Sequence, residues 1–139
     1  MSSLTNTLSL ETVRGLSNAA RLNVAGLGLT AAAMLFQMAA GSTLYPSVTG
    51  PVVLVLTALL VAFVPGRWPA YAGLIVPIVL GLGAVVAAAM SGGFMDQLTN
   101  VGNPGLLLGS VLHVVGLVAA VAGGVGMTLD RRVAGARAR

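Results

Sequence analysis

Four long apolar stretches dominate the chain, and short polar or Gly- and Pro-containing segments separate them. They cover residues 22–40, 48–64, 70–90 and 104–129. An α-helix needs about 20 predominantly apolar residues to cross a hydrocarbon core of ~30 Å, with about 17 as the lower limit. The pattern therefore predicts an all-α integral membrane protein in which four transmembrane helices form one bundle.

The last stretch divides into two faces of different character when it is placed on a helix at about 100° per residue. One face carries small or polar residues, namely Gly109, Ser110, His113, Gly116 and Gly124. The opposite face carries bulky aliphatic residues, including Val111, Val115 and Val118. Small residues mark helix–helix contacts in lipid because they let two backbones approach closely. We therefore expect the small face to pack inward and the bulky face to meet acyl chains.

The first and third stretches have comparable small faces. In the first stretch, the inward residues are Asn23, Gly26, Thr30, Ala33 and Gln37, with Val24, Ala31 and Leu35 opposite. In the third, the inward residues are Ala70, Gly73, Pro77, Gly81, Ala84 and Ala88, with Ile75, Val79, Leu82 and Val86 opposite. We expect these two helices and the last one to pack together. The second stretch has no such stripe and should be the most lipid-exposed helix.

Pro77 interrupts the third stretch. It removes one backbone hydrogen bond and should kink the helix, and Gly73 lies four residues earlier, where the proline ring would otherwise crowd. Such a kink can act as a hinge in a carrier, or it can simply shape a membrane helix.

The ends of the apolar region are polar. Residues 1–21 have spaced leucines and fit either a short interfacial helix or a frayed terminus. Asn103 and Pro104 form a favourable N-cap and first-turn pair for the last helix. Residues 130–139 form a basic tail.

Composition supports the membrane assignment. Of the 139 residues, 57% are hydrophobic and only 7% are charged, whereas a soluble domain has about 25% charged residues. There is no cysteine, which excludes disulfides, thiolate metal sites and thiol catalysis. A net charge of +4 would suggest nucleic acid in a soluble protein. Here the arginines flank apolar segments, so we expect a lipid bilayer and no nucleic acid as the partner. The use of Arg without Lys, with abundant Ala, Gly and Val, suggests a GC-rich bacterial genome.

The arginines also predict orientation. With four spans, Arg14, Arg21, Arg67, Arg131 and Arg132 all fall on the same side, together with the two tail arginines. The opposite loops contain no basic residue. Cytoplasmic loops carry the excess of basic residues. We therefore expect a multi-pass protein of the bacterial plasma (inner) membrane with both termini in the cytoplasm and these arginines in contact with lipid.

His113 is the main candidate for a functional intramembrane group. It lies nine residues after Pro104, about 13 Å along the helix and near the middle of a ~30 Å core. Titratable groups at that depth are often functional. A neutral imidazole can equally serve as a structural hydrogen-bond donor. Gln37 and Ser110 are the nearby candidates for its polar neighbours, since an interhelical hydrogen bond among them would hold the first and last helices together.

The sequence contains no paired carboxylates, catalytic triad, phosphate-binding loop or metal-ligand cluster. One histidine cannot supply two axial haem ligands within one chain. We therefore expect no enzyme activity, no cofactor and no metal. The favoured function is a non-catalytic accessory or assembly subunit of a larger membrane complex, associated with other membrane subunits or with itself. The alternatives are a small oligomeric carrier or channel that uses His113 and the Pro77 kink, and a binder of a lipophilic ligand such as a quinone.

Overall fold

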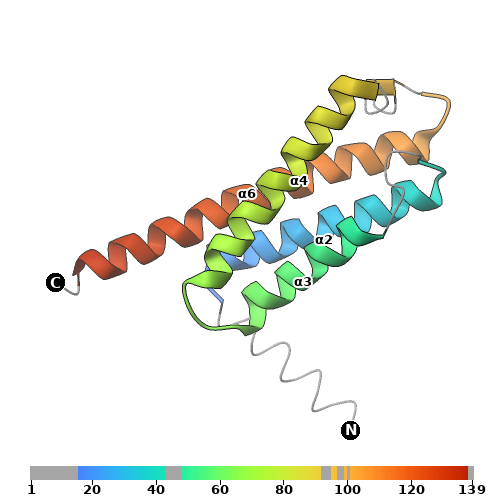
Figure 1. The fold of residues 1–139 in the computed structure, drawn as a ribbon. Coiled ribbons are helices and arrows are strands. Elements are labelled where there is room, and N and C mark those ends of the chain that lie inside the picture. The colour runs from blue at the N-terminus through green and yellow to red at the C-terminus, as the bar shows by residue number, and fades with distance from the viewer. Residues whose placement is uncertain (1–15, 43–47, 92–94, 97–98, 100, 138–139) are drawn as a thin grey trace, which may run out of the picture.

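The computed structural model describes residues 16–42, 48–91, 95–96, 99 and 101–137. Its main elements are four helices: α2 (Asn18–Ala39), α3 (Thr49–Phe63), α4 (Trp68–Ser91) and α6 (Pro104–Arg137). Helices α2, α4 and α6 are long and apolar enough to cross a membrane, while α3 is a shorter apolar helix. Figure 1 shows α2, α3 and α6 running roughly along one another, while α4 crosses α6 obliquely.

The helix bounds lie within a few residues of the predicted apolar stretches, except at the start of α2 and the end of α6. Helix α2 begins before residue 22 because the Ser17 hydroxyl accepts a hydrogen bond from the Ala20 amide at 3.2 Å and caps it. The proposed interfacial helix falls largely on residues 1–15, which are outside the described residues. The predicted cap of the last helix is confirmed, since Asn103 Oδ1 accepts from the Leu106 amide at 3.3 Å.

Helix α6 extends well beyond the predicted end at residue 129. It is helical through Arg137 and contains 34 residues, so it is about 51 Å long at 1.5 Å per residue. A hydrocarbon core is only ~30 Å thick. Residues 130–137 of the basic tail therefore continue the last helix, and the C-terminal turns of α6 project past the rest of the bundle (Figure 1).

The packing order differs from the predicted one. Helix α2 packs most extensively against α6 and then against α3, while α4 packs against α6 and α3 and scarcely touches α2. The expected packing of the first helix against the third is therefore limited to a small contact. Helix α6 lies between them, because its small residues face both neighbours: Gly116 approaches Thr30 of α2 and Gly124 approaches Leu74 of α4.

Helix α2 is buried on two sides. The five residues predicted to face inward are all buried, as expected: Asn23, Gly26, Thr30, Ala33 and Gln37. Ala31, which was expected on the exposed side, is buried as well. It belongs to an apolar cluster with Leu27 and Met34 that packs against Leu54 and Ala58 of α3. The prediction failed because α3 covers a second side of α2 that carries no small-residue stripe.

The most exposed helix is α4 and not α3. Only 17% of the apolar window of α4 is buried, compared with 44% for α2. Helix α3 buries five of its 15 residues. Because α4 crosses the bundle obliquely, its first half packs against the other helices and its second half stands away from them (Figure 1). The predicted outward residues Ile75, Val79 and Leu82 are indeed exposed.

Candidate functional site

Asn23 links three helices inside the bundle. Its side chain is fully buried, and Nδ2 donates to the carbonyl of Gly73 in α4 at 2.7 Å and to the carbonyl of Ala120 in α6 at 2.6 Å. Both hydrogens of the amide group are therefore used. Although α2 and α4 share little packing surface, this one side chain ties the two helices together.

The Asn23–Gly73 bond follows from the proline in α4. Pro77 has no N–H, so the carbonyl four residues earlier lacks its usual helical donor. That carbonyl belongs to Gly73, and Asn23 supplies the missing hydrogen bond. A Cβ at Gly73 would lie 2.6 Å from Asn23 Oδ1. The glycine is thus required by the approach of Asn23, a reason that differs from the ring crowding inferred from spacing alone.

Gln37 and Ser110, in the interface between α2 and α6, are buried without hydrogen-bond partners for their side chains among the described residues. Both are fully buried, and Gln37 packs against Gly109 of α6, so the first and last helices do bring these positions close. Within the described residues, however, neither polar atom of Gln37 nor the Ser110 hydroxyl has a hydrogen-bond partner. The expected hydrogen bond between them is not formed. A buried polar group without a partner costs free energy, so these two residues do not stabilise the interface in the way predicted.

His113 lies on the face of α6 that points into the protein. Its side chain is only 5% exposed, in agreement with the predicted inward orientation. Gly109 and Gly116, one turn before and one turn after it, contact Gln37 and Thr30 of α2. Among the described residues there is no group of three or more His, Asp or Glu side chains that could hold a metal ion.

Backbones of α2 and α6 approach closely along this interface. A Cβ at Gly26 would lie 2.7 Å from the Gly116 carbonyl oxygen, and one at Gly123 would lie 2.7 Å from the Ala19 carbonyl oxygen. Sequence reasoning placed Gly116 and Gly124 on the packing face but left out Gly123. The signal was present, because Ala119 and Gly123 repeat the four-residue spacing of Gly116, Ala120 and Gly124, and that spacing marks close helix contacts in membranes.

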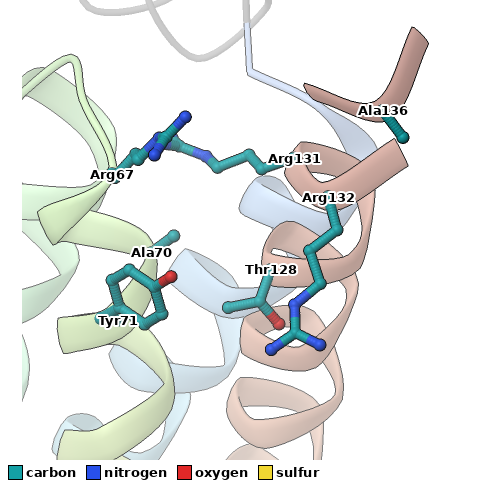
Figure 2. A pocket seen from close by; sticks show the side chains of 7 residues that line it. All are labelled: Arg67, Ala70, Tyr71, Thr128, Arg131, Arg132 and Ala136. Atoms are coloured by element: carbon teal, nitrogen blue, oxygen red, sulfur yellow. The ribbon is translucent and has the colours of Figure 1, made fainter. Parts of the chain in front are cut away.

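A basic pocket lies at the end of the bundle where α4 begins and α6 leaves it (Figure 2). Its volume is about 540 Å³, and its lining residues are Arg67, Ala70, Tyr71, Thr128, Arg131, Arg132 and Ala136. The Tyr71 hydroxyl points toward the space between the helices, whereas the Thr128 hydroxyl lies on the α6 side, near Arg132 (Figure 2). No carboxylate is among these lining residues, so the pocket carries three positive charges.

Arg131 spans the two sides of this pocket. It extends from α6, and its guanidinium donates to the carbonyl of Gly66 in the turn before α4. Gly66 has a φ of +132°, a conformation that glycine adopts readily. Arg131 thereby reaches toward Arg67 (Figure 2). Two guanidinium groups held near each other without a carboxylate between them attract an anion.

The remaining predicted lipid-contacting residues are placed as follows. Arg21 is exposed in the first turn of α2. Arg14 lies outside the described residues. A second hollow beside the basic pocket is lined by Ser17, which caps α2, by Ala20 of α2 and by Arg131. The start of α2 therefore lies at the same end of the bundle as the other arginines. The pocket itself was not foreseen, because Arg67 and Thr128 are 61 positions apart and only the crossing of α4 and α6 brings them together.

Comparison with known proteins adds no assignment: no family model, curated protein or solved structure matches the chain.

Proposed function

We propose that the protein is a non-catalytic accessory or assembly subunit of a larger complex in the bacterial plasma membrane, and that the second half of α4 contacts the partner. The first half of α4 packs on the bundle, where Val76 and Leu80 lie against the apolar core. One, two and three turns further along the same side of the helix come Gly83, Ala87 and Met90, which are exposed. The side of α4 that packs on the bundle in its first half is therefore left uncovered in its second half, and this observation supports the proposal.

The residue types on that uncovered face favour a protein contact over a lipid contact. Gly83 has nothing within 4 Å of the position where its Cβ would be, and Ala87, one turn further along the same face, is also exposed. Lipid-facing positions gain from bulky side chains, whereas small side chains allow a second helix to approach closely. Elsewhere in the bundle, glycine serves that purpose at Gly26 and Gly116.

The proposal includes four spans with both termini in the cytoplasm. The end of the bundle that carries Arg67 and Arg131 also carries the start of α2, as the excess of basic residues on the cytoplasmic side requires. Reporter fusions after Leu44 and after Gln97 should read outside, and fusions at Arg67 and at the C-terminus should read inside. A C-terminal reporter that is active only outside would contradict either the count of four spans or the orientation.

Position-specific crosslinking tests the contact. A photoreactive amino acid at Ala87 should crosslink in intact cells to another membrane protein of defined mass. The same amino acid at Val118, on the exposed face of α6, should not. Native mass measurement after mild detergent extraction should show the same additional mass. Equal crosslinking from both positions, or a monomer that carries only lipid, would contradict the proposal.

The unpaired polar groups favour one alternative, a small oligomeric carrier or channel. Gln37 and Ser110 are fully buried and lack partners among the described residues, as groups that contact a transported solute or water would. On this alternative, crosslinking from α4 should yield only homo-oligomers, and Gln37→Leu should abolish transport without lowering the thermal stability of the protein.

A further inference from the structure

The basic pocket has the chemistry of a phosphate-binding site. Three arginines line it, and a guanidinium group forms paired hydrogen bonds with phosphate oxygens. The Tyr71 hydroxyl adds a further donor. The Thr128 hydroxyl donates to the Val125 carbonyl at 2.8 Å, so it lines the pocket without supplying a donor to the phosphate. The first turn of α4 contributes the partial positive charge of a helix N-terminus.

The position of the pocket indicates where the phosphate comes from. Its floor consists of Ala70 and Tyr71, in the first turn of the apolar helix α4, and of Thr128, at the end of the apolar part of α6. Trp68 and Tyr71 are exposed here, at 84% and 48%, and Trp and Tyr are enriched at the level of lipid headgroups. The pocket therefore opens at the boundary between hydrocarbon and water, where phosphate groups of lipids lie.

We propose that the pocket formed by Arg67, Tyr71, Thr128, Arg131 and Arg132 binds the phosphate headgroup of an anionic phospholipid. The lipid phosphate lies between the start of α4 and the end of α6, and it neutralises the adjacent guanidinium groups. Basic pockets between membrane helices on the cytoplasmic side commonly hold anionic headgroups. The bound lipid joins α4 to the projecting end of α6, in addition to the direct bond from Arg131 to the Gly66 carbonyl. This site is separate from the exposed second half of α4.

The single tryptophan of the chain provides a direct probe, because Trp68 begins α4 beside the pocket. The full-length protein is reconstituted into phosphatidylcholine vesicles that contain increasing fractions of phosphatidylglycerol brominated near the headgroup end of its acyl chains. Bromine quenches tryptophan fluorescence on contact. A parallel series with brominated phosphatidylcholine gives the reference, and the ratio of the two quenching curves gives the preference for the anionic lipid.

We expect the wild-type protein to prefer the anionic lipid, and Arg132→Gln to lower this preference by up to about fivefold, the effect of one arginine near an anionic surface. Arg131→Gln should act in the same way but also removes the bond to Gly66. Arg137→Gln is the matched control, since it removes one charge from the same helix outside the pocket, and it should leave the preference unchanged. Unchanged fluorescence maxima and helical circular dichroism check that each variant is folded.

Three results would overturn the proposal. Equal quenching by both lipids in the wild-type protein excludes a selective headgroup site. An equal loss of preference in Arg132→Gln and Arg137→Gln shows general surface attraction in place of a pocket. Finally, inorganic phosphate is added at constant ionic strength, and relief of quenching at millimolar concentrations identifies a site for free phosphate and not for lipid.

Discussion

The α2–α6 interface and the second half of α4 carry the same small residues but differ in how closely a neighbouring helix approaches them. Along α2 and α6, glycines bring backbone against backbone, as where a Cβ at Gly26 would meet the Gly116 carbonyl at 2.7 Å. On α4, a Cβ at Gly81 would meet only the flexible side chain of Leu117, and one at Gly83 would meet nothing within 4 Å. A glycine in a membrane helix therefore marks a potential contact, and the neighbouring helix decides whether the contact is made.

Polar groups are also used differently at the two ends of the α2–α6 interface. In the α2–α6 interface, the Thr30 hydroxyl donates to the Gly26 carbonyl at 2.8 Å and Asn23 donates to two other helices. Gln37 and Ser110, near the opposite end of the same interface, have no such partners among the described residues. The end of the bundle near Asn23 is thus tied together by hydrogen bonds, whereas the end near Gln37 depends on shape. This difference predicts unequal effects of substitution along one interface.

The largest expected effect is that of Gly26→Ala. The added methyl group would clash with the backbone of α6 at Ala120 and Gly116, and since backbone cannot rotate away, the helices must separate. We expect a loss of roughly 3 kcal/mol in the free energy of unfolding, at the upper end of overpacking costs. Thermal unfolding in mild detergent, followed by circular dichroism, measures it. Gly28→Ala is the control, because no atom lies within 4 Å of its Cβ position. Similar melting temperatures for both variants would show that the α2–α6 approach is not this close.

The second effect concerns the bond between Asn23 and the carbonyl freed by Pro77. Asn23→Ala removes two interhelical hydrogen bonds and leaves the Gly73 carbonyl without a donor, so it should cost about 1–2 kcal/mol. Pro77→Ala restores an N–H that can donate to the same carbonyl within α4. We therefore expect Pro77→Ala to recover part of the loss in the Asn23→Ala background, with a coupling of order 1 kcal/mol in a double-mutant cycle. Strict additivity of the two substitutions would show that Asn23 does not compensate for the proline.

Most of the fold could be predicted from sequence, because long apolar stretches and small-residue faces are local patterns. The hydropathy pattern predicted the four helices. The helical periodicity of residues 104–129 predicted which side of α6 is buried and which is exposed, with Val115 and Val118 outward. The neighbours could not be predicted. Ala31 is buried because α3 covers it, and α4 is the most exposed helix because it crosses obliquely. Neither outcome can be predicted from the residues of the helix itself, because each depends on where a neighbouring helix lies.

For the buried polar residues, too, the orientation could be predicted from sequence but the partners could not. Asn23, Gln37, Ser110 and His113 could be assigned to inward faces, because helical periodicity fixes the direction of a side chain. Their hydrogen-bond partners depend on how neighbouring helices are aligned along their axes, and the periodicity of one helix does not determine that alignment. The basic pocket could not be predicted for the same reason. Pro77 did predict the loss of one helical hydrogen bond in the third stretch, but not the residue that replaces it.

The third prediction separates a structural from a functional role of His113. His113→Leu removes a polar side chain from a close-packed face and adds branched bulk, so it should cost about 1–2 kcal/mol in detergent. His113→Gln keeps a hydrogen-bond donor and should be nearly neutral for stability. Complementation of a strain that carries each variant as its only copy gives the second readout. If His113→Gln is stable and normally expressed but does not complement, the side chain acts chemically, since glutamine does not titrate near neutral pH.

The smallest expected effects on stability come from substitutions in α4, and they test whether the exposed Gly83 contacts a partner helix. Gly81→Leu should cost about 1 kcal/mol, because the flexible Leu117 side chain can move aside when it is crowded. Gly83→Leu should leave the unfolding of the isolated chain almost unchanged, since there is open space around this position. On the proposed partner contact, however, the bulky side chain holds a second helix away, so the additional mass in native mass measurements should disappear. Val79→Leu, on an exposed face of the same helix, should preserve both stability and association. Retention of the partner by Gly83→Leu would leave the small residues of α4 facing only lipid, and the accessory-subunit proposal would lose the observation that supports it.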